Sequence, residues 1–171
     1  KGSVYLDGKD ISKMTESRLA QIRGRKIGFI FQKFNLINTL TAKENVMLPM
    51  MFQGYSAEER SQKADELLKL VDLEDRKHHR PNELSGGQQQ RVAIARSLSN
   101  DPDVILADEP TGNLDSKTGD NVMNFLEKLH KEKGTTIVMV THDEETAEHA
   151  DRVEYLRDGQ IVKSLKKNKK R

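Results

Sequence analysis

The sequence Leu84-Ser85-Gly86-Gly87-Gln88 leads directly into Gln89-Gln90-Arg91-Val92-Ala93-Ile94-Ala95-Arg96. Ser85 is a favoured N-cap residue, and the apolar residues after it recur at helical spacing, so a helix is predicted to begin here. The two glycines leave the first backbone amides of this helix uncovered by side chains. Free N–H groups and the positive end of the helix dipole suit an anion such as phosphate. Read alone, Ser85-Gly86-Gly87 also fits a tight turn with an ordinary cap. The rest of the sequence is therefore needed to choose between an ordinary turn and an anion site.

The composition is that of a well-solvated protein with enough residues for one domain and its core. The chain has 171 residues, of which 33% are charged, 35% are hydrophobic and none is cysteine. The lack of cysteine excludes disulfides, thiolate metal sites and a cysteine nucleophile. A formal net charge of +2 is too small to indicate a nucleic acid partner by itself. No apolar run approaches the length that spans a membrane, so direct membrane insertion is not expected.

Three apolar runs predict the strands of a sheet. They cover residues 27–31, 104–107 and 136–140, and continuous runs of this kind are typical of strands buried on both faces. Helical patterns alternate with them, and a hairpin is predicted between 152–156 and 160–164. Strands that alternate with helices indicate an α/β fold with a mainly parallel sheet.

Polar residues stand where each of these runs ends. Gln32 follows the first run, Asp108-Glu109 the second, and His142 is the second residue after the third. Parallel α/β sheets bind ligands at the carboxyl ends of their strands. Two adjacent carboxylates there are costly to desolvate unless a cation or hydrogen-bond donors meet them. A Mg²⁺ ion would meet that need for Asp108, and Glu109 could then accept a proton from an attacking water. Taken singly, Gln32 and His142 also fit an ordinary strand exit and an ordinary helix flank.

The segment from residue 40 to residue 75 has helical patterns and no strand. Thr41 can cap one helix, and Ser56-Ala57-Glu58-Glu59 is a capping box that opens another. Between them lies the methionine-rich stretch 47–52, which is typical of a core but can also form an adaptable surface for a partner helix. We interpret the chain as one domain in three parts: core strands in 1–39, a small helical subdomain in 40–100, and further core in 101–171.

The order of these residues is that of a known family. The whole chain resembles the nucleotide-binding domain of ABC transporters, and residues 80–85 and 110–115 are similar to the lipoprotein-releasing and macrolide-export type. The resemblance implies a RecA-like P-loop NTPase core with an inserted helical subdomain. The matching motifs are the Q-loop at Gln32, the signature at Leu84-Ser85-Gly86-Gly87-Gln88, Walker B and its glutamate at Val104 to Glu109, the D-loop at Asn113-Leu114-Asp115, and the switch histidine at His142.

The resemblance also implies a role for each residue in ATP hydrolysis. Asp108 would hold Mg²⁺ on ATP, and Gln32 would sense that metal and link the site to the helical subdomain. Glu109 would polarise the attacking water, and His142 would contact the γ-phosphate. Ser85, Gly86, Gly87 and Gln88 would bind a nucleotide held mainly by a second copy of the domain, and Asp115 would support that dimer contact.

The implied partners are a second ATP-binding domain, as a homodimer, and a transmembrane permease at the cytoplasmic face of the membrane. Met47 to Met51, beside Gln32 and Phe34, is the expected docking place for the permease, so a charge at Met50 or Met51 should uncouple transport without unfolding the domain. The basic end, residues 166–171, fits either a solvated terminus or a linker towards a membrane segment.

One motif of the family does not occur in the sequence. No G-x-x-x-x-G-K-[ST] is present, and the resemblance places this phosphate-binding loop, with an adenine-stacking aromatic residue, upstream of residue 1. We therefore expect that the N-terminal part of the domain is missing and that this polypeptide alone binds ATP weakly or not at all. The alternative function is a non-catalytic module that supplies the signature in trans to a complete domain. A DNA-associated relative is disfavoured, because those proteins carry a long coiled coil where this chain has a compact helical segment.

Overall fold

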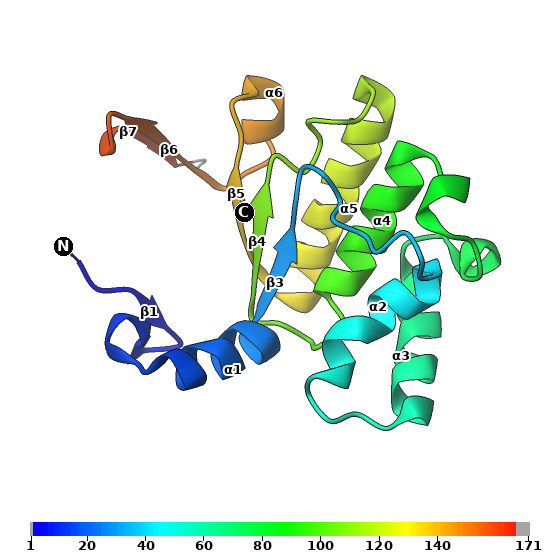
Figure 1. The fold of residues 1–171 in the computed structure, drawn as a ribbon. Coiled ribbons are helices and arrows are strands. Elements are labelled where there is room, and N and C mark those ends of the chain that lie inside the picture. The colour runs from blue at the N-terminus through cyan, green and yellow to red at the C-terminus, as the bar shows by residue number, and fades with distance from the viewer. Residues whose placement is uncertain (1, 167–171) are drawn as a thin grey trace.

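The computed structural model describes residues 2–166, and its centre is a parallel β-sheet (Figure 1). Within the described residues this sheet has three strands in the order β3-β4-β5. In the register, Ile27 pairs with Val104, which in turn pairs with Thr136. The prediction of an α/β fold with a parallel sheet is confirmed. The strands are β3 (Ile27–Ile30), β4 (Val104–Asp108) and β5 (Thr136–Val140).

Two helices cover one face of the sheet (Figure 1). Ile30 and Ile105 point towards them and are 1% and 0% exposed. Val138 and Val140 lie on the opposite face and are 51% and 63% exposed. The prediction that these strands are buried on both faces is therefore wrong for the described part of the chain, because its helices pack against one side of the apolar runs only. The covering helices are α4 (Gly86–Ser97) and α5 (Ser116–Lys133).

The packing of α4 on β3 is unusually close. A Cβ atom at Gly28 would lie 2.5 Å from the carbonyl oxygen of Ser97, nearer than any side chain can approach. Only a glycine lets the last turn of the helix contact the strand in this way. On its far side α4 packs against α2 (Ala42–Met51) and α3 (Ala57–Leu70). The division of the chain at residues 39 and 100 stays a prediction.

The methionine-rich stretch belongs to the last turns of α2, with Pro49 inside the helix, and does not lie between two helices. Met50 is 0% exposed and forms part of the core, whereas Met51 is 52% exposed. The expectation that a charge at Met50 would leave the fold intact is therefore wrong, since a charge would be buried there without a partner. Only Met51 of this pair can contact another protein.

The remaining elements lie around this centre. The predicted hairpin is confirmed, whereas α6 ends three residues before the predicted end at about Ala150. Of the basic end, residues 167–171 lie outside the described part of the chain. No helix between residues 2 and 166 combines the length and the apolar character needed to cross a membrane. These elements are β1 (Tyr5–Leu6), β2 (Lys9–Asp10), α1 (Glu16–Lys26), α6 (Glu144–Ala147), β6 (Arg152–Arg157) and β7 (Gln160–Lys166), with 3-10 turns at Ile11–Lys13, Glu74–Arg76 and Pro81–Glu83.

A buried asparagine at the start of α2 organises the loop that leads from β3 into this helix. Asn45 is 0% exposed, and its Oδ1 accepts a hydrogen bond of 2.8 Å from the backbone N–H of Ile37. Its Nδ2 donates to the carbonyls of Ile37, Leu40 and Thr41 at 3.1, 3.2 and 2.9 Å. One side chain thus bonds four backbone groups of this segment, two of which, the carbonyls of Ile37 and Thr41, also accept from backbone N–H groups.

Replacing Asn45 by leucine, which has a similar shape, is expected to lower the free energy of unfolding by about 2–4 kcal/mol, because buried backbone groups lose their partners. Urea denaturation followed by circular dichroism measures this loss. Asn124, which is exposed on α5, is the matched control, and its change to leucine should alter stability by less than about 0.5 kcal/mol. Equal effects at the two positions would contradict the assigned role.

Candidate functional site

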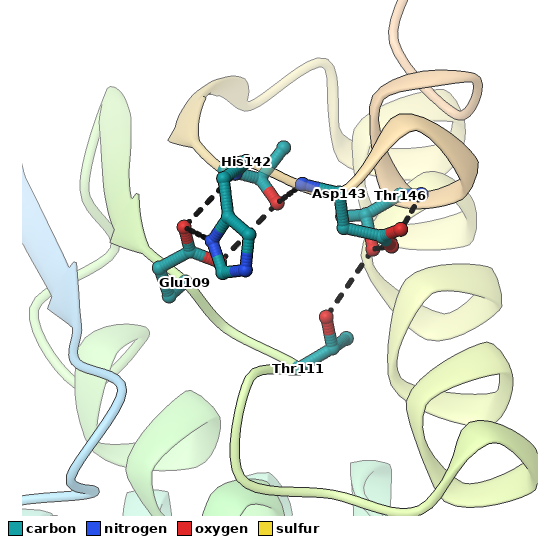
Figure 2. Close-up of polar contacts among 6 residues, drawn as sticks. Glu109, Thr111, His142, Asp143 and Thr146 are labelled. Carbon is teal, nitrogen blue, oxygen red and sulfur yellow. Dashed lines mark hydrogen bonds and ion pairs between the residues drawn. The ribbon is translucent and has the colours of Figure 1, made fainter.

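Glu109 directly follows the last residue of β4 and is held by the segment that follows β5 (Figure 2). Its Oε1 accepts a hydrogen bond of 2.9 Å from the backbone N–H of His142 and pairs with the Nδ1 of the same residue at 2.5 Å. Its Oε2 accepts a longer bond of 3.3 Å from the hydroxyl of Thr141. The two bonds from His142 to Oε1 therefore fix the orientation of the carboxylate, while Oε2 accepts a single, longer bond among the described residues.

The same pair changes the protonation of His142. The hydrogen bond to Glu109 and its negative charge raise the pKa of His142, with a smaller contribution from Asp143. Because Nδ1 faces the carboxylate, Nε2 is the nitrogen that can serve another group. The protonated ring carries a proton on both nitrogens, so it can bond to Glu109 and donate to an anion at the same time.

A second group of hydrogen bonds joins the turn after Glu109 to the start of α6 (Figure 2). Asp143 Oδ2 accepts bonds from the backbone N–H of Thr146, at 2.9 Å, and from its hydroxyl, at 2.5 Å. These donors lower the pKa of Asp143. The hydroxyl of Thr146 also lies 3.3 Å from that of Thr111. The loops that carry Glu109 and His142 are thus tied together on both sides.

Gln32 lies against the same turn. The side-chain amide of Asn113 donates to the backbone carbonyl of Gln32 at 2.6 Å. A Cβ at Gly112 would lie 2.8 Å from the Nε2 of Gln32, and the N–H of Gly112 donates to the carbonyl of Glu109 at 3.1 Å. The structure therefore brings together Gln32, Glu109 and His142, three residues that the sequence singled out in separate segments.

Asp108 points a carboxylate towards solvent at the end of β4. It makes no hydrogen bond or ion pair within the described residues, and these residues contain no group of three or more acidic or histidine side chains that could enclose a metal. One free carboxylate nevertheless fits Mg²⁺, because this ion commonly takes one or two protein carboxylates and completes its shell with phosphates and waters. Asp108 is the carboxylate of this region that would hold it.

The predicted helix start at Ser85 is confirmed. The Ser85 hydroxyl accepts a hydrogen bond of 3.3 Å from the N–H of Gln88, and the Gln88 side chain accepts one of 2.9 Å from the N–H of Ser85. This is a complete capping box at the first turn of α4. Because the serine oxygen acts as the acceptor there, its proton remains available to a phosphate oxygen.

The two signature glycines have different surroundings. A Cβ at Gly87 would lie 2.3 Å from the methyl carbon of Thr118, so the first turn of α4 packs tightly on that of α5. A Cβ at Gly86 would make only ordinary contacts of 3.7 Å or more. Asp115 caps α5 by accepting a bond of 3.1 Å from the N–H of Thr118, and its hydrogen bonds with Thr118 lower the pKa of Asp115. The D-loop and the signature therefore lie side by side in one chain.

The residues singled out by the sequence thus fall into two groups. Gln32, Asp108, Glu109 and His142 form one group at the carboxyl ends of the strands, and residues 85–88 with Asp115 form the other at the starts of α4 and α5. Across the described residues no hydrogen bond or ion pair joins residues 85–88 to Glu109 or His142. The first group offers carboxylates, an amide and an imidazole, and the second offers a hydroxyl and the free N–H groups of a helix start, so the two groups present different chemistry to a ligand.

Arg96, near the end of α4, is a residue of this region that the sequence did not single out. Its guanidinium donates to the carbonyls of Phe34 at 2.8 Å and Asn35 at 2.5 Å. Both residues have positive φ angles, 46° and 50°, so Arg96 holds a strained turn directly after Gln32. Burial lowers the pKa of this guanidinium. The sequence signal that could have identified Arg96 is a charged residue on the apolar face of a predicted helix, where it needs hydrogen-bond acceptors.

Comparison with known proteins agrees with this geometry. The sequence model of the ABC transporter family matches residues 1–112. An uncharacterised ABC transporter ATP-binding protein of Thermotoga maritima is 58% identical over 161 residues, which are 94% of this chain and 68% of that protein. The macrolide export ATP-binding/permease protein MacB of Mannheimia succiniciproducens is 50% identical over 98% of this chain but only 26% of its own length. A dimeric ATP-binding cassette of Methanocaldococcus jannaschii, solved in a post-hydrolysis state with ADP and Pi, superposes with a TM-score of 0.86 at 50% identity, covering 97% of this chain and 73% of the cassette.

The fold and the site together define an ATP-binding α/β domain with the chemistry of an ATPase. The chain belongs to the ABC transporter family, in which it is an ATP-binding subunit.

A pH titration of the histidine resonances by NMR checks the central pair. His142 should titrate above the usual histidine pKa of about 6.5, and Glu109→Gln should lower its midpoint towards that value while the other histidines stay unchanged. Because the folded pKa is raised, the pair stabilises the fold fully below the usual value, and this contribution is lost as the pH rises through the raised pKa. A midpoint for His142 that is the same in both proteins would rule out the pairing.

Proposed function

We propose that this chain powers a membrane transporter by ATP-driven dimerisation, with each nucleotide held between two domains. The observation that carries this proposal is that, among residues 2–166, no hydrogen bond or ion pair joins the two groups of site residues. Two copies arranged head to tail could bring the first group of one chain against the second group of the other. The dimeric form of the related M. jannaschii cassette supports such an arrangement.

The first group would carry out the chemistry of phosphoryl transfer to water. Glu109 Oε2, which receives only the longer bond from Thr141, is the oxygen with free capacity to accept a proton from the attacking water. Protonated His142 would keep its bond to Glu109 and donate from Nε2 to the γ-phosphate. A Mg²⁺ ion held by Asp108 and Gln32 would neutralise charge on the ATP phosphates when bound.

The second group would bind the nucleotide of the partner chain. The Ser85 hydroxyl and the backbone N–H groups of Gly86 and Gly87 would contact its γ-phosphate at the positive end of α4. Gln88 would keep this turn in place through the capping box, and Asp115 would support the contact between the two chains.

The permease would dock beside the end of α2 and keep the chain at the cytoplasmic face of the membrane. Met51 and Phe52 are 52% and 80% exposed there, which leaves an apolar surface without a cover. A cleft of about 250 Å³ lies between α1, β3, α2 and α4, and its lining includes Phe31, Asn35 and Pro49. The apolar rim and this cleft fit a short helix of a membrane partner. The similarity to a macrolide export ATP-binding/permease protein supports a partner of this type.

A complementation assay tests the shared site. The chain is mixed with Mg²⁺, ATP and a complete ABC ATP-binding domain in which the signature serine has been replaced, and phosphate release is measured. Rescue by roughly 100-fold is expected, the magnitude typical of restoring a donor to the transition state. Ser85→Asp should abolish the rescue, because aspartate keeps the N-cap but repels phosphate, whereas Ser85→Thr should retain it.

Glu109→Gln separates the proposal from its alternative in the same assay. In the rescued site the catalytic glutamate belongs to the complete domain, so this variant should rescue as well as the unmodified chain. If the chain alone hydrolyses ATP and Glu109→Gln abolishes that activity, the chain forms a complete catalytic site without the second domain, and the non-catalytic alternative is excluded. No rescue at saturating concentration would contradict the trans role in both functions.

Docking of the permease is tested at Met51. Met51→Asp is expected to reduce ATP-driven transport in membrane vesicles roughly tenfold or more, because a charge enters an apolar interface. Its free energy of unfolding should change by less than about 0.5 kcal/mol, since the side chain is exposed. Val4→Asp, at an apolar position that is 58% exposed near the N-terminus, is the control. Undiminished transport by Met51→Asp would refute this docking surface.

A further inference from the structure

A glutamine in the second turn of α4 is buried although two other glutamines precede it at the surface of the same helix. Gln90 is 0% exposed. Its Nε2 donates a hydrogen bond to the backbone carbonyl of Pro110, and its Oε1 is buried without a partner among the described residues. An apolar side chain of similar size would fill this space and remove the unpaired oxygen, but it would leave the carbonyl of Pro110 without this donor. The bond to Pro110 is therefore what the amide adds.

Pro110 follows Glu109, whose backbone is strained. Glu109 has a φ of 47°, in the left-handed region that non-glycine residues rarely adopt. Such a conformation persists only where the surroundings hold it. Its N–H donates to the carbonyl of Val140 at 2.9 Å, and its carbonyl accepts from the N–H of Gly112 at 3.1 Å. Pro110 has no N–H, so its carbonyl is the one backbone group of this residue that can form a hydrogen bond.

The direction of the Glu109 side chain depends on this backbone. A strained residue that relaxes changes its φ angle and moves its carboxylate away from its partners. The bond of 2.5 Å between Glu109 Oε1 and His142 Nδ1 leaves little room for such movement. Gln90 is the group of α4 that reaches this turn, and it lies two residues beyond the signature residue Gln88.

We propose that Gln90 is a positioning residue for hydrolysis, whose amide reaches from the signature helix and fixes the strained backbone that presents Glu109. The inference rests on the catalytic role proposed for Glu109. The geometry it invokes can nevertheless be measured without turnover, because His142 reports where the carboxylate of Glu109 lies. Gln90 itself touches neither Glu109's carboxylate nor the nucleotide site.

The experiment compares Gln90→Met with Gln89→Met in the whole chain. Methionine keeps the length of the side chain but removes the donor, and Gln89 is the matched control because its amide donates to the carbonyl of Leu84 instead. The pH midpoint of His142 is followed by NMR. In Gln90→Met it should fall by at least half of the fall that Glu109→Gln produces, whereas in Gln89→Met it should not change. A merely structural role would lower stability without moving this midpoint.

The outcomes distinguish the inference from the proposed function. If Glu109→Gln moves the His142 midpoint and a folded Gln90→Met does not, the role of Gln90 is refuted. If Glu109→Gln itself has no effect, the pair on which the proposed function relies is refuted as well. Should Gln90→Met fail to fold, hydrogen exchange in the unmodified chain decides: the N–H of Gly112 should be as protected as the amides of α4, and exchange at the rate of exposed loops would overturn the proposal.

Discussion

The position of α4 against β3 is the constraint on which the site depends. At Gly28 the two backbones approach so closely that the carbonyl of Ser97 occupies the place of a side chain. With this end of the helix fixed on the sheet, Arg96 reaches the turn after Gln32, and Gln90 reaches the turn after Glu109. The opposite end presents Ser85 at the surface. One helix thus sets the geometry of loops that lie far apart in the sequence.

The two groups of site residues differ in charge, and this difference governs how each can meet a phosphate. Asp108 and Glu109 place two carboxylates at the strand ends, so an ATP phosphate would be repelled there unless a divalent cation and a protonated His142 offset the charge. The start of α4 carries only neutral side chains and the positive end of a helix dipole, so it can accept an anion without a metal. The two groups are therefore complementary halves rather than repeats of one binding site.

Much of this arrangement could be predicted because the signals are local. The capping box at Ser85 depends on residues three positions apart, and each apolar run is followed within two residues by the polar group that matters. The family resemblance then joined these segments into one site. The ends of α5 depend on equally local chemistry, with Asp115 as its N-cap and the left-handed Gly134 as its C-cap.

What could not be predicted depends on tertiary packing. An apolar run such as 136–140 does not show whether one face or both are covered, and here Val138 and Val140 are exposed in the described structure. Met50 and Met51 are neighbours of the same residue type, but in α2 they face different directions, so one is buried and the other exposed. Gln90 is the last of three glutamines, and its only signal is that Ile94 follows four residues later on the same helical face. No feature of the sequence predicts the positive φ of Glu109.

The contact between Gly87 and Thr118 has a consequence for genetics. Any residue larger than glycine at position 87 would disturb two things at once, the approach of a phosphate to α4 and the packing of α4 on α5. A loss-of-function allele at this position is therefore ambiguous by itself. A second-site suppressor that shortens Thr118 would relieve the packing but could not restore a blocked phosphate site, so the presence or absence of such suppressors would separate a folding defect from a binding defect.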